Sequence, residues 1–274
     1  MLSLCATPIG NLGDLTPRVA EAFSASDCIY CEDTRRTLQL LNHLGLKKPL
    51  VSCHAHNEAA RTEELIALLR AGKHICYASD AGMPGISDPG ERLVRACIEH
   101  DLPFEVLPGA SAVLTAAVLS GLPCGRFTFF GFLPRDNSAR REMLSDLAAC
   151  PHLMILYESP HRVVSTLRLL LDTLGDRPAA LVRELTKKFE GAERGTLSAL
   201  LARLTEPPKG ECVLCVLGQR KEPAAPDGAA LDAALTKSLA AGLSVRDAAA
   251  AAAERFGIPK KDAYRRALSI GEEG

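Results

Sequence analysis

The chain has 274 residues, enough to bury a substantial core in one or two domains. Hydrophobic residues make up 47% of it, which excludes an intrinsically disordered chain. The formal net charge of -1 gives no overall attraction to nucleic acid, so any RNA partner must be held by local basic patches. No apolar run reaches the ~18 residues of a membrane span, and the first residues lack a signal-peptide pattern, so we expect a cytoplasmic protein.

Short apolar runs alternate with helical stretches in the first part of the chain, residues 1–123. Thr16-Pro17 and Asp88-Pro89 each combine a capping residue with a proline at the first helical position, which predicts two helix starts. Strands alternating with helices predict an α/β domain with a mainly parallel, doubly wound sheet. The predicted strands are residues 2–6, 28–31, 50–53, 74–79 and 104–107, and further helices are expected at 59–69 and 110–119.

The second part, residues 124–220, has more strands that follow one another directly, which predicts an α/β domain with a mixed sheet. Its predicted helices are 136–149, one that starts at Ser159-Pro160, and 196–204. Its predicted strands are 127–132, 153–157, 179–183, 188–194 and 211–217.

A linker rich in Pro and Ala is predicted at residues 221–228, followed by a small helical tail up to residue 274. Ser244 is the expected cap of a helix over 245–256 that ends at Gly257, and Pro259 opens a second helix up to Ile270. The two helices form a unit that resembles a helix-turn-helix.

The ten cysteines include two pairs with the CxxC spacing common in zinc sites, Cys28 with Cys31 and Cys212 with Cys215. Apolar residues separate both pairs, and both segments have the composition of strands. Residues three apart on a strand point to opposite faces, so neither pair is suited to bind one ion. We expect buried, reduced thiols and no metal site.

Three loops rich in Gly, Pro and Asp follow predicted strands, at residues 7–14, 79–90 and 108–112. In open α/β sheets, ligands bind beyond the carboxyl ends of the strands, where glycines let the backbone approach them. The first loop matches neither the GxGxxG pattern nor the Walker pattern, which disfavours a dinucleotide site or a P-loop. The three loops together predict one shared ligand cleft.

Seven motifs occur in an order that resembles the ribosomal RNA small-subunit methyltransferase I family, within the tetrapyrrole-methylase-like S-adenosylmethionine enzymes. The resemblance covers residues 1–220, and the tail is similar to that family's helical extension. It implies two α/β domains with S-adenosylmethionine in the cleft between them, a homodimer, and 2′-O-methylation of a cytidine ribose in the decoding region of 16S rRNA. The motifs are TPIGNLGD (7–14), EDTRRT (32–37), HNE (56–58), SDAGMPGISDPG (79–90), PGASA (108–112), ESPHR (158–162) and KGECVL (209–214).

The same resemblance implies which residues contact the cofactor. Most of them belong to the three loops of the first domain, and the others come from strand ends of the second. They are Pro8, Gly10, Asp80, Ala81, Gly82, Ile86, Ser111, Ala112, Tyr157, Leu185, Gly210 and Cys212.

Methyl transfer from a sulfonium is an in-line displacement, for which the enzyme supplies orientation and electrostatics. A ribose 2′-hydroxyl is a poor acid, so a general base should face it. Glu32, Asp33 and His56 are the candidates. Alternatively, Glu32 and Asp33 belong to a helix cap, and His54 and His56, on one strand face, bind a metal or make ordinary hydrogen bonds.

Basic side chains in four places are candidates for phosphate contacts: directly after Glu32-Asp33-Thr34, near the domain junction, at the helix start after Ser159-Pro160, and in the tail. The alternative is a solvated side chain or helix face, or cap packing in the case of Arg162. In the tail only Asp262 opposes the basic side chains. The candidates are Arg35, Arg36, Arg135, Arg162, Lys260, Lys261, Arg265 and Arg266.

Two other functions remain open. A methyltransferase of a small tetrapyrrole would share the fold and the cofactor, but such enzymes usually have Gly-Asp-Pro where this chain has Ser79-Asp80-Ala81-Gly82. A non-catalytic ribosome-binding protein would hold the cofactor as a structural ligand, yet no motif is disrupted.

Overall fold

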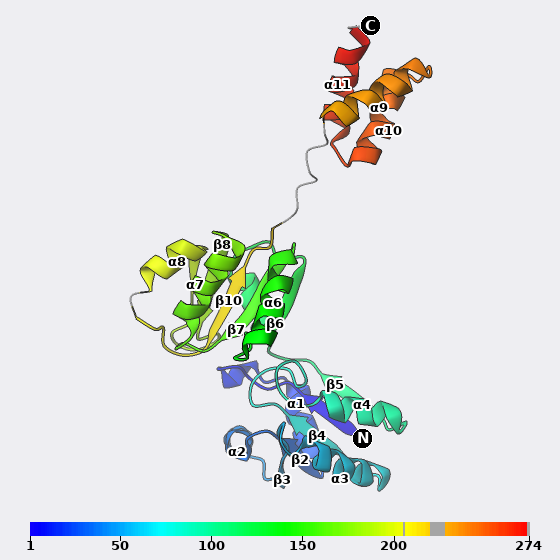
Figure 1. Cartoon of the computed structure of the whole chain (residues 1–274). Coiled ribbons are helices and arrows are strands. Elements are labelled where there is room, and N and C mark those ends of the chain that lie inside the picture. The colour runs from blue at the N-terminus through cyan, green and yellow to red at the C-terminus, as the bar shows by residue number, and fades with distance from the viewer. Residues whose placement is uncertain (205, 220–227, 273–274) are drawn as a thin grey trace. The chain divides into compact units, whose positions relative to one another are not determined.

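The computed structural model describes residues 1–204, 206–219 and 228–272. The chain divides into two compact units, Met1–Gly218 and Gln219–Gly274 (Figure 1). The first contains two five-stranded sheets, and the described part of the second is helical. Within the described ranges, no helix is both long and apolar enough to cross a membrane. Apart from Gly228, the predicted linker 221–228 lies outside the described residues.

The first sheet is entirely parallel, in the order β3-β2-β4-β1-β5, as the alternating pattern predicted. Its central strands β1 and β4 are buried along their whole length, which explains why their residues are apolar apart from Ser3. The strands are β1 (Leu2–Cys5), β2 (Cys28–Cys31), β3 (Leu50–Ser52), β4 (Ile75–Ala78) and β5 (Phe104–Leu107). The helices are η1 (Leu12–Asp14), α1 (Pro17–Ala25), α2 (Thr34–His43), α3 (Glu58–Arg70), α4 (Glu91–Glu99) and α5 (Ala112–Leu119).

The second sheet has the order β6-β7-β10-β8-β9 and is mixed, which confirms the prediction. Only β6 and β7 are parallel, and the other neighbours are antiparallel. The strands are β6 (Phe127–Phe132), β7 (Leu153–Glu158), β8 (Pro178–Arg183), β9 (Gly191–Thr196) and β10 (Cys212–Val216). The helices are α6 (Asn137–Ala149), α7 (Val163–Leu174) and α8 (Leu197–Arg203).

Of the three predicted starts with a cap and a proline, one is confirmed and two are wrong. Thr16 caps α1. The start at Asp88-Pro89 is wrong because α4 begins after Gly90, whose φ of 136° is open to glycine but not to most residues. The start at Ser159-Pro160 is wrong because the carbonyl of Ser159 closes a separate turn before α7.

The strand predicted at 188–194 begins later than expected, at the start of β9. The preceding residues form a loop in which the Glu190 carboxylate accepts the backbone N–H of Thr186 at 2.6 Å. This side-chain contact closes the chain on itself and delays the pairing with β8.

The cysteines of the two CxxC pairs lie in strands and carry free thiols, as predicted. Cys31, Cys212 and Cys215 are buried, and Cys28 is half-buried. Burial raises the pKa of Cys215 to about 12, so its thiol stays protonated and packs as an apolar group.

The second unit contains α9 (Gly228–Ala240), α10 (Val245–Phe256) and α11 (Lys260–Glu272). The Ser244 hydroxyl accepts the backbone N–H of Asp247 at 3.2 Å, and Gly257 ends α10 in the left-handed region, so both predicted caps are confirmed. The core of the unit consists mainly of alanines on α10 and α11, which let the helices approach closely.

Candidate active site

A cavity of about 400 Å³ lies where the carboxyl ends of the first sheet meet strands β7 and β10 of the second. The three loops predicted to share a ligand cleft all contribute to its wall. Of the twelve residues predicted to contact the cofactor, nine line this cavity: Asp80, Ala81, Gly82, Ile86, Ser111, Ala112, Tyr157, Leu185 and Cys212.

The remaining three, Pro8, Gly10 and Gly210, are not among the lining residues, although Ile9 is. Gly10 packs against the loop that carries Leu185: a Cβ at Gly10 would lie 2.6 Å from Cγ of Lys187. Gly210 adopts a φ of 83° beside Glu184. At both positions a side chain would collide with residues 184–187, so these two glycines allow close packing against that loop.

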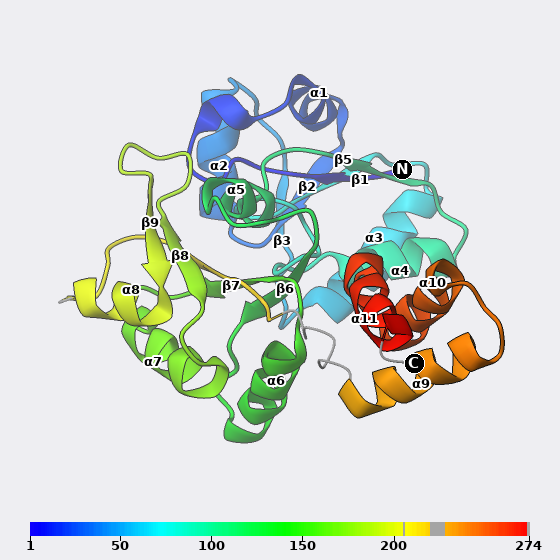
Figure 2. The ribbon, with the colours of Figure 1, turned by 90° about the horizontal axis from the view of Figure 1, so that it is seen from above.

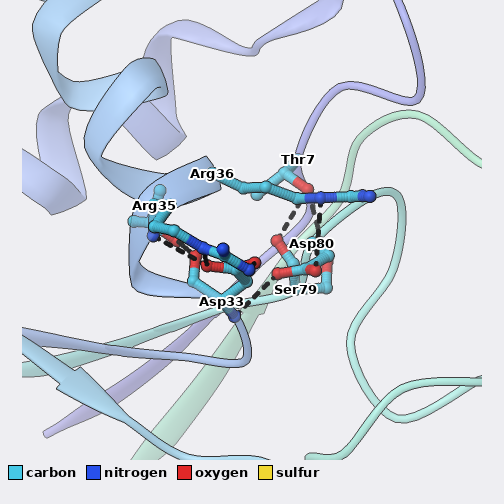
Figure 3. A network of polar contacts seen from close by, with 7 residues as sticks. Thr7, Asp33, Arg35, Arg36, Ser79 and Asp80 are labelled. Carbon is cyan, nitrogen blue, oxygen red and sulfur yellow. Dashed lines mark hydrogen bonds and ion pairs between the residues drawn. The ribbon is translucent and has the colours of Figure 1, made fainter.

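Hydrogen bonds fix the first two loops to each other and to α2 (Figure 3). Backbone bonds of 2.9 and 3.0 Å join Thr7 and Gly82 in both directions. The Thr7 hydroxyl donates to the carbonyl of Ser79, and the Ser79 hydroxyl donates to that of Gly82. Asp80 accepts the backbone N–H of Asp33 at 2.9 Å. The cavity wall is therefore preorganised.

The three candidate bases have different surroundings. Glu32 lines the cavity, whereas Asp33 and His56 are not among its lining residues. Asp33 is the N-cap of α2, and hydrogen bonds from Arg35 lower its pKa to about 2. This is the geometry of the helix-cap alternative, and it makes Asp33 a weak base.

The two histidines do not share a strand face as the sequence suggested, because β3 ends at Ser52 and both lie in the turn after it. The rings of His54 and His56 meet edge to face, with centroids 5.9 Å apart, and His56 is exposed. Among the described residues, no group of three His, Cys, Asp or Glu side chains is arranged to hold a metal ion.

Asp88 is a lining residue that the sequence interpretation missed. Burial raises its pKa to about 6, with further contributions from the charges of Glu32 and Asp80. Burial also raises the pKa of Glu32, and Asp80 adds to the effect. Arg36 is the basic residue of this wall and lies 3.6 Å from the Asp80 carboxylate. The wall thus carries an excess of negative charge.

The opposite wall is aromatic. Phe132 and Tyr157 pack edge to face with ring centroids 5.5 Å apart, and burial raises the pKa of Tyr157 to about 12. Glu158, mostly buried and also a lining residue, accepts the Thr166 hydroxyl at 2.7 Å and lies 3.4 Å from Arg162. This wall is suited to a flat, partly apolar ligand.

The predicted RNA-binding residues are spread over separate surfaces. Arg35 and Arg135 are exposed, whereas the Arg162 guanidinium donates to the carbonyl of Leu133 and has a structural partner there. Arg36 belongs to the cavity.

In the tail, Lys260 and Lys261 are exposed, and Arg265 lies 3.6 Å from Asp262. The expectation that only Asp262 opposes the tail's basic residues is wrong. Arg266 donates to both carboxylate oxygens of Asp232 on α9, at 2.7 and 2.6 Å. The two residues are 34 positions apart, so sequence spacing did not indicate their contact.

Comparisons with known proteins agree with this geometry. Residues 1–201 match the family of Tetrapyrrole (Corrin/Porphyrin) Methylases, and residues 225–271 match the RsmI C-terminal HTH domain. The chain is 43% identical over 278 residues to a ribosomal RNA small subunit methyltransferase I from Synechocystis, covering all of this chain and 99% of that protein.

Two solved structures share the fold. Diphthine synthase superposes with a TM-score of 0.64 and 16% identity, over 79% of this chain and 89% of that one. A uroporphyrin-III C-methyltransferase from Thermus thermophilus, complexed with S-adenosyl homocysteine, gives a TM-score of 0.56 and 19% identity, over 78% of this chain and 96% of that one.

The fold and the family match define a methyltransferase of the tetrapyrrole methylase class, whose enzymes depend on S-adenosylmethionine. Within this class, the chain belongs to the ribosomal RNA small subunit methyltransferase I family. The predictions of family, fold and cofactor are thereby confirmed.

Proposed function

We propose that the chain transfers the methyl group of S-adenosylmethionine to the ribose 2′-hydroxyl of a cytidine in the decoding region of 16S rRNA. The observation that carries this proposal is the similarity over the full length of a small-subunit rRNA methyltransferase, tail unit included. That tail also favours rRNA over a small tetrapyrrole as the substrate, since a macrocycle has no use for a second binding unit.

The cavity fits the cofactor in size and charge. A volume of about 400 Å³ lies in the range of small-molecule sites. S-adenosylmethionine carries a positive sulfonium, which suits a wall on which Glu32, Asp80 and Asp88 outnumber Arg36. When bound, the cofactor supplies an activated methyl group. Gly82 and Ala112 leave the cavity open at the loop side, and Tyr157 offers an aromatic surface for the adenine.

Asp88 is the group we favour as the base for the 2′-hydroxyl proton, with Glu32 beside it. A carboxylate whose pKa is about 6 is ionised at neutral pH and is a stronger base than an exposed aspartate. Glu32 contributes a neighbouring negative charge that raises the proton affinity of Asp88. Arg36, which lines the same cavity, is the proposed contact for a phosphate near the reacting ribose.

We also propose that the chain forms a homodimer and that it acts in the cytoplasm, where ribosomes are. Helix α5 contains one polar residue, Thr115, among apolar ones. Leu114 and Val118, one turn apart on it, are 54% and 73% exposed. A second copy of the chain is the proposed cover for this apolar face.

The test is methyl incorporation from labelled S-adenosylmethionine into 30S subunits, naked 16S rRNA and a precorrin, measured side by side. Label in 16S rRNA that maps to a ribose supports the proposal. Label only in the precorrin contradicts the RNA substrate, and bound cofactor without label in any substrate supports the non-catalytic alternative.

A further inference from the structure

The loop that joins β8 to β9, residues 184–190, carries an unusually exposed aromatic side chain at its tip. Phe189 is 74% exposed, more than any other large apolar side chain among the described residues. The Lys188 ammonium lies 5.6 Å from the centroid of its ring. The tip therefore offers a flat apolar face next to a positive charge.

This loop is held in a fixed shape. The Lys187 ammonium donates to the carboxylates of Glu184 and Glu211, both at 2.9 Å, and the Glu190 carboxylate accepts the backbone N–H of Thr186. Lys187 thus anchors the loop to the start of β10, and Phe189 is presented at low entropic cost.

Two residues of the loop have backbone conformations that L-residues rarely adopt. Glu184 has a φ of 51° and Thr186 a φ of 64°. For a β-branched residue such as threonine this conformation is strained, and strain of this kind concentrates at ligand-binding segments. A glycine at position 186 would adopt this conformation without strain. The need for a turn alone therefore does not account for the threonine.

The loop also borders the active site. Leu185 lines the cavity, and Gly10, in the loop after β1, leaves room for Lys187. Figure 2 shows the loop extending beyond the sheet that contains β8 and β9. Phe189 is four residues after Leu185, and four residues of chain span at most about 14 Å. Phe189 therefore lies within a few nucleotides' length of a ribose bound at the cavity.

We infer that Phe189 stacks on an unpaired base of the RNA substrate while Lys188 contacts the adjoining phosphate. The inference rests on the proposed function and adds a substrate contact to it. A single exposed ring between charged neighbours is too small for a protein-docking patch but has the size of one base, and aromatic stacking with a nearby cation is the usual way to hold single-stranded RNA.

The test is steady-state methylation of 30S subunits by the variants Phe189→Ala, Phe189→Tyr and Phe189→Leu. Loss of one stacked base should raise the KM for 30S subunits by roughly 5- to 150-fold. The KM for S-adenosylmethionine should stay unchanged, and Phe189→Tyr should restore most of the affinity. Ile98→Ala, at a 61% exposed position on α4, is the matched control.

Two results would overturn the inference. One is a Phe189→Ala enzyme with an unchanged KM for 30S subunits. The other is full restoration by Phe189→Leu, which would indicate an apolar protein contact in place of stacking. Failure of the proposed function itself is distinguished by the unmodified enzyme, which would then methylate no RNA at all.

Discussion

The carboxylate of Asp80, at the end of β4, accepts the backbone N–H of Asp33 at the start of α2 from 2.9 Å. One side chain therefore joins two neighbouring strand ends, and its second oxygen faces Arg36 at 3.6 Å (Figure 3). Replacing Asp80 by alanine leaves a donor of the α2 start without this partner and removes a negative charge from the cavity.

We expect Asp80→Ala to weaken cofactor binding by about 10- to 100-fold, equivalent to about 1.4 to 2.8 kcal/mol. Isothermal titration with S-adenosylmethionine measures this directly. Asp146→Ala, at an exposed position on α6, is the control and should bind normally. Equal affinity of the two variants for S-adenosylmethionine would mean that Asp80 does not contribute to cofactor binding.

Ala112 tests where the cofactor lies. It begins α5 and lines the cavity, so Ala112→Leu should fill part of the cavity and reduce cofactor affinity by at least about 10-fold. The thermal midpoint should change little, because the added atoms extend into open space. Ala139→Leu on the exposed face of α6 makes the same substitution away from the cavity. Normal cofactor affinity in Ala112→Leu would contradict the proposed position.

Much of this site was readable from the sequence because loops at the carboxyl ends of parallel strands must meet at one edge of the sheet. The contribution of Asp88 was not readable. Its Asp-Pro pair is typical of a helix start, but α4 begins after Gly90, which has a positive φ, and Asp88 lines the cavity.

The contact between Arg266 and Asp232 was missed for a different reason. It depends on how α9 packs against α11, which no local pattern encodes. In contrast, the mixed second sheet and the caps of α10 were predicted correctly, because strand succession and capping are local signals.

Asp88 should set the acid limb of the pH profile. We expect kcat/KM of the unmodified enzyme to fall about tenfold per pH unit below about 6, where Asp88 becomes protonated, and to level off above it. Asp88→Asn should lower kcat by about 10²- to 10⁴-fold and remove this limb. A limb that persists in Asp88→Asn would assign it to another group, with Glu32→Gln as the next variant to measure.

Ionised Asp88 should favour catalysis but lower the stability of the folded state. The folded-state pKa of Asp88 lies above its ordinary value of 3.8, so its ionisation disfavours the folded state as the pH rises from about 4 to 6. Asp88→Asn should therefore be more stable than the unmodified chain above pH 6, by about 1 to 3 kcal/mol, and equally stable below pH 4. Urea unfolding at the two pH values measures the difference.

The apolar face of α5 predicts the oligomeric state. Val118 is 73% exposed, and a glutamate at this position would place a charge in the proposed interface. We expect Val118→Glu to raise the dimer dissociation constant by at least about 10-fold, measured by sedimentation equilibrium. Ile98→Glu on α4 is the control and should leave the dimer intact. A monomeric unmodified chain would contradict the proposal for this face.

Charge reversal at the basic residues of α11 should distinguish a role in RNA binding from a role in folding. Lys260 and Lys261 lie in the first turn, where positive charge opposes the helix dipole, so they are unfavourable for the helix itself. Reversing both to glutamate should stabilise α11 slightly, by about 0.3 to 1 kcal/mol per residue, yet weaken binding to 30S subunits. The slope of log affinity against log salt concentration should become shallower by roughly 0.7 to 0.9 for each phosphate that the variant no longer neutralises.

Arg266→Glu is the contrasting variant, because it breaks the pair with Asp232 and should lower the thermal midpoint of the tail. Binding to 30S subunits at several salt concentrations, together with thermal unfolding, distinguishes the two effects. Unchanged affinity and salt slope in the double reversal would show that Lys260 and Lys261 form only a solvated helix face.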